Sequence, residues 1–71
     1  MNISDEFRAR GFMTEAEAAR FLGVAANTLK FWRAQKKGPR YFKPAKQPIY
    51  RRDDLEAFVL NSAVRTADVA A

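Results

Sequence analysis

Residues 30–52 form a segment in which cations alternate with large apolar side chains. The segment carries nine lysines and arginines and neither aspartate nor glutamate, whereas the rest of the 71-residue chain carries four cations and eight anions, for a net charge of +5. Its large apolar residues are Phe31, Trp32, Tyr41, Phe42, Ile49 and Tyr50. We expect such a segment to fold and to present a basic face, because a merely solvated face normally mixes both signs of charge. A folded basic face on a small protein is typical of nucleic-acid binding.

The length and composition exclude several other classes of protein. Seventy-one residues predict one domain with a small core and no deep cleft. Cysteine and histidine are absent, so we expect no disulfide, no zinc site and no Cys–His or Ser–His catalysis. The prediction is a protein that is not an enzyme and has no catalytic residue, metal or cofactor. No apolar run approaches the ~20 residues that cross a membrane, and the acidic N-terminus does not resemble a signal peptide.

Residues 14–35 carry the signals of two helices joined by a tight turn. Thr14 and Glu17 have the spacing of a capping box, which predicts a helix start, and Gly23 suits the left-handed residue that ends a helix. A second helix is expected over residues 26–35, with Leu29 and Trp32 on its buried face. Two helices joined by a short turn that contains glycine predict a helix-turn-helix.

The next segment predicts a β-hairpin. Short runs of strand character at residues 40–43 and 49–51 flank a polar turn that begins and ends with proline. Asp53 lies three residues before Glu56, and this cap-like spacing predicts the start of a third helix. Asp53, Asp54 and Glu56 could form a metal or catalytic cluster, but helix capping and a favourable interaction with the helix dipole explain them better.

The third helix is predicted to have an apolar face made of Leu55, Phe58 and Val59. We also expect Phe58, Trp32 and Tyr50 to be core residues rather than stacking platforms for single strands. The predicted organisation is an N-terminal arm over residues 1–11, a DNA-binding domain over 12–63 and a C-terminal tail over 64–71.

Four segments in chain order resemble the excisionase/MerR-like winged helix-turn-helix proteins. These are residues 13–24 (MTEAEAARFLGV), 27–33 (NTLKFWR), 38–41 (GPRY) and 49–58 (IYRRDDLEAF). The resemblance implies a mainly α fold with a small β-hairpin: a helix-turn-helix, a two-stranded wing and a closing helix. Ala25 departs from the family, which often has Ser or Thr there. Full MerR regulators also carry a dimerisation helix and an effector domain, for which this chain has no room, so we expect no small-molecule ligand.

The resemblance implies binding to double-stranded DNA by a small phage or mobile-element protein. Excisionases, also called recombination directionality factors, bind adjacent sites, bend DNA and direct an integrase of the tyrosine type. This implies copies of the same chain and an integrase as partners, in the bacterial cytoplasm and associated with the nucleoid. An AlpA-type transcriptional regulator is the alternative. A protein-interaction or RNA-binding module that uses the hairpin aromatics is the second alternative.

The expected DNA contacts fall into two groups. Recognition-helix contacts are expected from Ala26, Asn27, Thr28, Lys30, Phe31 and Arg33. Phosphate and wing contacts are expected from Thr14, Lys36, Lys37, Arg40, Lys43, Lys46, Gln47 and Arg51. Asn27 and Thr28, near the start of the recognition helix, should read bases. Lys30 and Arg33 should contact both bases and phosphates. Lys46 and Gln47 should reach the minor groove, unless they are only turn residues. The tail, with the N-terminal arm, is a candidate for contact between copies, although frayed ends explain it equally well.

Overall fold

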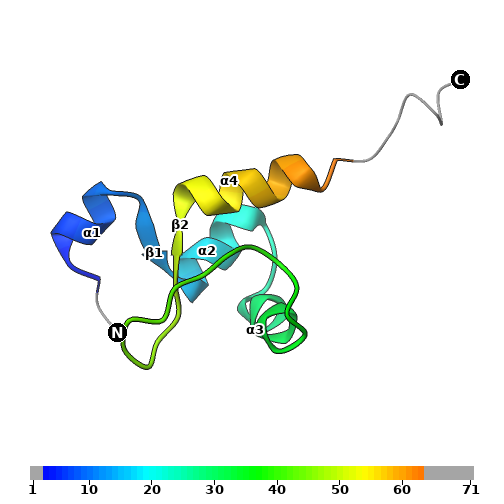
Figure 1. Cartoon of the computed structure of the whole chain (residues 1–71), viewed down its shortest axis with the longest axis horizontal. Helices are drawn as coiled ribbons and strands as arrows, with labels where there is room; N and C mark the ends of the chain where they lie inside the picture. The colour runs from blue at the N-terminus through cyan, green and yellow to red at the C-terminus, as the bar shows by residue number, and fades with distance from the viewer. Residues whose placement is uncertain (1–2, 64–71) are drawn as a thin grey trace, which may run out of the picture.

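The computed structural model describes residues 3–63 as four helices and a small sheet (Figure 1). The elements are α1 (Asp5–Ala9), β1 (Phe12–Thr14), α2 (Glu15–Leu22), α3 (Ala26–Ala34), β2 (Ile49–Arg51) and α4 (Arg52–Asn61). This order confirms the predicted fold, which is mainly α-helical with a small antiparallel β-structure and a winged helix-turn-helix. No helix within residues 3–63 has the length and apolar character needed to span a membrane.

The predicted capping box starts α2. The Thr14 hydroxyl accepts a hydrogen bond from the Glu17 amide at 3.2 Å, and the Glu17 carboxylate accepts one from the Thr14 amide at 2.9 Å. At the other end Gly23 has φ 77°, and the amide of Val24 donates to the Ala19 carbonyl at 2.9 Å. The chain therefore reverses within three residues and starts α3 at once, as the sequence predicts.

The core lies where α2, α3, β2 and α4 meet. Its buried residues are Ala18, Ala19, Leu29, Tyr50 and Leu55, and Met13, Leu22, Val24 and Trp32 pack against them. The Trp32 and Phe58 rings lie 5.5 Å apart between α3 and α4. The prediction that the two rings and Tyr50 serve the core is confirmed.

The strand predicted over residues 40–43 is wrong in extent. Only Phe42 pairs with Ile49, through two hydrogen bonds of 2.8 and 2.7 Å, and the main partner of β2 is β1. Prolines at 44 and 48 bracket the loop, and because they lack an N–H they limit the pairing to one bridge. Residues 12–14 are too short a run to be recognised as a strand from sequence. We define the wing as residues 40–51 and the wing loop as residues 43–48.

The predicted start of the last helix is also wrong. Arg51 is the N-cap residue of α4, no side chain caps the helix, and the Asp53 carboxylate pairs with Arg51 at 3.0 Å. The predicted apolar face of this helix is only partly buried, because Val59 is 49% exposed; Phe21 on α2 is 43% exposed. So small a domain has too few elements to cover both sides of each helix.

The N-terminal arm contains the short helix α1. The Ser4 hydroxyl caps it by accepting from the Phe7 amide at 3.2 Å, and Ile3 is buried. The predicted tail over residues 64–71 lies outside the described residues.

Candidate nucleic-acid interface

One face of α3 is exposed along the whole helix. Leu29 is fully buried and Trp32 packs on the core, so these two residues fix which side of the helix faces inward. The exposed stripe contains Ala26, Asn27, Lys30 and Phe31. Phe31 is 59% exposed, although it is a large apolar residue within a helix. Four of the six side chains predicted to contact DNA from this helix therefore share one solvent-facing surface.

The other two recognition-helix residues are less accessible. Thr28 is half-buried at the edge of the stripe. Arg33 is also half-buried, and its guanidinium donates to Glu15 through Nε at 2.6 Å and Nη2 at 3.2 Å. This bidentate hydrogen bond raises the pKa of the Arg33 guanidinium above its ordinary value. The charge of Arg33 is matched by Glu15 within the protein, and its contact with DNA stays a prediction.

Glu15 and Arg33 belong to a polar cluster that joins three elements. The Tyr50 hydroxyl on β2 donates to the Glu15 carboxylate at 3.0 Å. The Arg33 guanidinium also lies 5.6 Å from the centre of the Tyr41 ring, which in turn lies 5.9 Å from the Tyr50 ring. We call these four residues the Glu15 cluster. Burial of the Tyr50 side chain and its hydrogen bond to Glu15 raise the pKa of the Tyr50 hydroxyl far above its ordinary value.

The Glu15 cluster fixes α3 relative to the wing. Through these contacts α3 is joined to Glu15 at the start of α2, to Tyr50 on β2 and to Tyr41 near the start of the wing. Sequence reasoning missed Glu15, since a first-turn glutamate has an ordinary role at a helix N-terminus. The partner lies 18 residues away on another helix, and no spacing pattern reports that contact.

The wing loop supplies a second exposed surface. Lys43, Lys46 and Gln47 are all exposed, as are Pro44 and Ala45 in the same loop. In Figure 1 the wing loop and α3 lie along the same lower edge of the molecule, and α4 lies along the opposite edge. The fold thus brings together two surfaces that the sequence predicted separately.

A polar hollow of about 300 Å³ separates the start of α2 from the wing loop. It is lined by Thr14, Glu15, Ala16, Gln47, Pro48 and Ile49. Two residues predicted as phosphate or wing contacts, Thr14 and Gln47, therefore face the same space. The Thr14 hydroxyl oxygen accepts the capping hydrogen bond from the Glu17 amide. The hydroxyl proton can still be donated in a second hydrogen bond.

The cations of residues 30–52 are mostly uncompensated. Among the described residues only Arg33 and Arg51 of the nine form ion pairs, with Glu15 and Asp53. The other seven are exposed: Lys30, Lys36, Lys37, Arg40, Lys43, Lys46 and Arg52. Within the wing, the Arg40 guanidinium lies over the Phe42 ring, 4.9 Å from its centre.

The N-terminus of α3 carries no side-chain cap. Ala25 is extended and makes no capping hydrogen bond, as expected for a chain that lacks the Ser or Thr frequent at this position. The partial positive charge of the helix N-terminus adds to that of the neighbouring cations. The arrangement has the chemistry to hold phosphates along one edge and to present amide and hydroxyl groups to base edges.

The chain matches the helix-turn-helix domain family over residues 12–62, which is more than half of its length. It belongs to that family. No curated protein is similar enough to this helix-turn-helix domain to count as a relative. Membership agrees with the observed geometry: the domain binds double-stranded DNA, and its family is typically not enzymatic.

Proposed function

We propose that this helix-turn-helix domain is a bacterial excisionase that binds and bends DNA next to an integrase. The observation that carries the proposal is the edge that α3 and the wing loop share. These two segments carry Lys30, Lys43 and Lys46 of the seven uncompensated cations. A helix entering the major groove and a wing entering the next minor groove grip the duplex at two places. Such a two-point grip favours a bent duplex, and bending costs of order 1–6 kcal/mol that extra contacts repay.

In this proposal one group of residues recognises bases and a second group binds the DNA backbone. Asn27 and Thr28 read base edges in the major groove, with Lys30 and Phe31 beside them. The residues that hold the DNA backbone, through phosphate and wing contacts, are Thr14, Lys36, Lys37, Arg40, Lys43, Lys46 and Gln47. Arg33 and Arg51 contribute mainly through their ion pairs, which position α3 and the start of α4.

The first test is a footprint on the DNA that flanks the gene, with and without a candidate integrase. We expect several adjacent protected sites and an integrase footprint that changes when the helix-turn-helix domain is present. Circular-permutation gel shifts should show a bend at each site. Protection of a single promoter-proximal site without bending would contradict the excisionase role and favour an AlpA-type regulator.

The second test is the salt dependence of binding. If six of the seven uncompensated cations contact phosphates, affinity should fall ~10³-fold between 50 and 200 mM salt. A nearly flat dependence would contradict phosphate contact as the source of affinity. A preference for single-stranded RNA over duplex DNA in the same titration would favour the RNA-binding alternative.

A further inference from the structure

Phe31 is the most exposed aromatic residue of the described chain, and it lies in the middle of α3. It is 59% exposed, whereas the other exposed aromatic residues are between 39% and 43% exposed. The core does not need this ring, because Leu29 and Trp32 already occupy the inner side of the helix. Single exposed apolar side chains are common on proteins, so the position of Phe31 in the exposed stripe of α3 matters more than its exposure alone.

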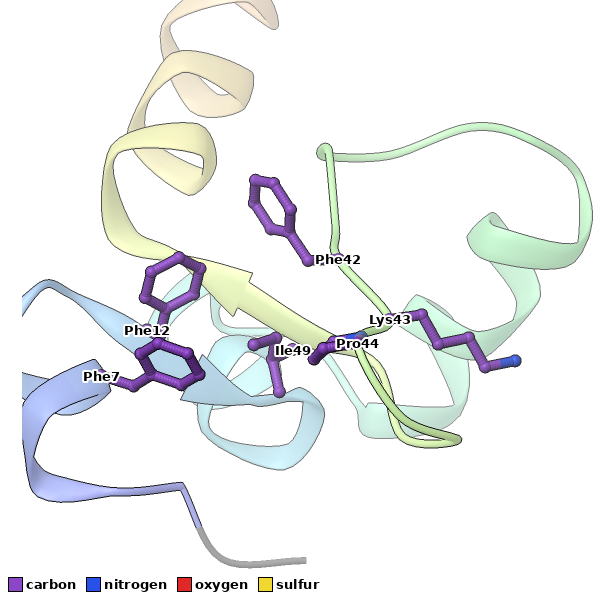
Figure 2. A pocket seen from close by; sticks show the side chains of 6 residues that line it. All are labelled: Phe7, Phe12, Phe42, Lys43, Pro44 and Ile49. Carbon is purple, nitrogen blue, oxygen red and sulfur yellow. The ribbon is translucent and has the colours of Figure 1, made fainter.

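Other exposed aromatic rings have partners within the protein. The Phe7 ring lies 5.2 Å from the Phe12 ring, in an open hollow of about 350 Å³ between α1 and the wing (Figure 2). The Tyr41 ring lies 5.9 Å from the Tyr50 ring. Among the described residues, none of the close ring pairs and neither of the contacts between an arginine and a ring includes Phe31. The Phe31 ring is therefore available to a molecule that approaches α3.

The surroundings of Phe31 on α3 suit a polyanion that also carries groups for hydrogen bonding. Asn27 lies one helical turn before Phe31 on the same face, since residues four apart are neighbours on a helix. Lys30 directly precedes Phe31, and α3 contains no acidic residue. Duplex DNA can therefore bring its bases to Phe31 without repulsion from a carboxylate on the same helix.

The chemistry of the major groove narrows the partner of this ring to one group. A side chain on the outer face of a helix in that groove meets the edges of paired bases, and these edges consist mainly of hydrogen-bond donors and acceptors. A phenyl ring cannot pair with them. Thymine is the exception, because its C5-methyl group projects into the major groove and makes apolar contacts with side chains such as phenylalanine. Stacking on the face of a base would instead require unpaired bases.

We infer that Phe31 is a specificity-determining residue that recognises the C5-methyl group of a thymine in the bound duplex. The inference rests on the proposed function only for the placement of α3 in the major groove. Asn27, one turn away, has the amide group that pairs with adenine in this groove. One turn of an α-helix advances about 5.4 Å and one base pair about 3.4 Å, so the thymine lies one or two base pairs from the adenine that Asn27 contacts.

The test replaces thymine by deoxyuridine, which keeps the hydrogen bonds of the base pair and removes only the methyl group. The duplex is obtained by selecting preferred sequences from a random library, so it depends neither on an integrase nor on the DNA that flanks the gene. Each thymine of the selected site is replaced in turn. Loss of one buried methyl group weakens a contact by about 4-fold, and the wild-type protein should lose this affinity at one or two thymine positions.

Phe31→Ala assigns the loss to this ring. The variant should bind the selected site more weakly than the wild type, and it should bind the thymine and deoxyuridine duplexes equally at the sensitive positions. Its unfolding, followed by the fluorescence of Trp32, should stay close to that of the wild type, because the ring lies mostly in water. Phe21→Ala is the matched control: Phe21 is an exposed phenylalanine at the end of α2 beside α4, and its removal should keep both the affinity and the discrimination.

Three results would overturn the inference. The first is a wild-type protein that binds every deoxyuridine duplex as tightly as the thymine duplex. The second is a loss that persists undiminished in Phe31→Ala, which would assign the methyl contact to Ala26 or Thr28. The third is a selection that returns no preferred sequence. By contrast, footprints that show no effect on an integrase would contradict the excisionase role and leave the contact between Phe31 and thymine intact, because the selected duplex measures it separately.

Discussion

Replacement of Glu15 by glutamine tests the structural role of the Glu15 cluster. Glutamine keeps the size of the side chain and one carbonyl oxygen, but it loses the negative charge that two Arg33 nitrogens and the Tyr50 hydroxyl share. At least one of these donors then faces the amide NH₂ group instead of an acceptor. The Arg33 side chain is only 21% exposed, so water solvates its charge poorly once the carboxylate is gone.

The size of the effect follows from these contacts. Hydrogen bonds to charged groups contribute about 1.5–3 kcal/mol, and breaking a fully buried ion pair costs about 3–5 kcal/mol. The ion pair between Arg33 and Glu15 retains some solvent access, so we expect Glu15→Gln to lower the free energy of unfolding by ~2 kcal/mol. A domain of this length has roughly 4–10 kcal/mol of stability, and such a loss lowers Tm by ~8–16 °C.

Urea unfolding monitored by tryptophan fluorescence measures this loss directly. Trp32 is the only tryptophan, and it packs between the core and the Phe58 ring, so its emission reports global unfolding. Glu56→Gln is the matched control, because Glu56 is exposed on α4 and should change stability by no more than about 0.5 kcal/mol. Equal stabilities of the two variants would refute the structural importance of the Glu15 cluster.

Four further substitutions probe the recognition helix, the wing loop, the turn at Gly38 and the capping box. Asn27→Ala should relax sequence preference, with a loss of ~1–3 kcal/mol on the specific site, whereas Lys46→Ala should weaken specific and random duplexes alike; competition binding that gives the opposite pattern would reverse these roles. Gly38→Ala should destabilise the fold by ~1–3 kcal/mol, because φ is 83° and the new Cβ would lie 3.1 Å from the indole side chain; an unchanged melting temperature would contradict this. Hydrogen bonds, first from the capping amide and then from Arg8, hold the pKa of Glu17 below its ordinary 4.5, so its stabilisation is full above that pH and is lost as the pH falls through the lowered folded pKa. Melting temperatures of Glu17→Gln should therefore depend less on pH in the acid range than those of the wild type, and parallel curves would exclude this contribution.

The sequence predicted the parts of the fold that local chemistry determines. Thr14 with Glu17 and the glycine at 23 set the ends of α2, because capping and left-handed backbone conformation depend on residues within one turn. The buried side of α3 followed from the three-residue spacing of Leu29 and Trp32, which also left Asn27 facing outward.

Sequence reasoning failed where long-range contacts decide the outcome. The pairing of β2 with β1 joins residues about 37 positions apart, and three residues of β1 carry no pattern of their own. Arg33 looked like one more cation beside Lys30, and only the three-dimensional position of Glu15 shows that its charge is matched. The exposure of Leu60 likewise depends on how little of α4 the other helices cover.

Amide chemical-shift mapping on a duplex from the footprinted region tests the central claim most directly. The account predicts that the largest shifts fall on the exposed stripe of α3, on the wing loop and at the start of α2 around Thr14, and that they weaken between 50 and 200 mM salt. Shifts confined to α1 and α4 on a one-site duplex, with α3 and the wing loop unchanged, would contradict the account.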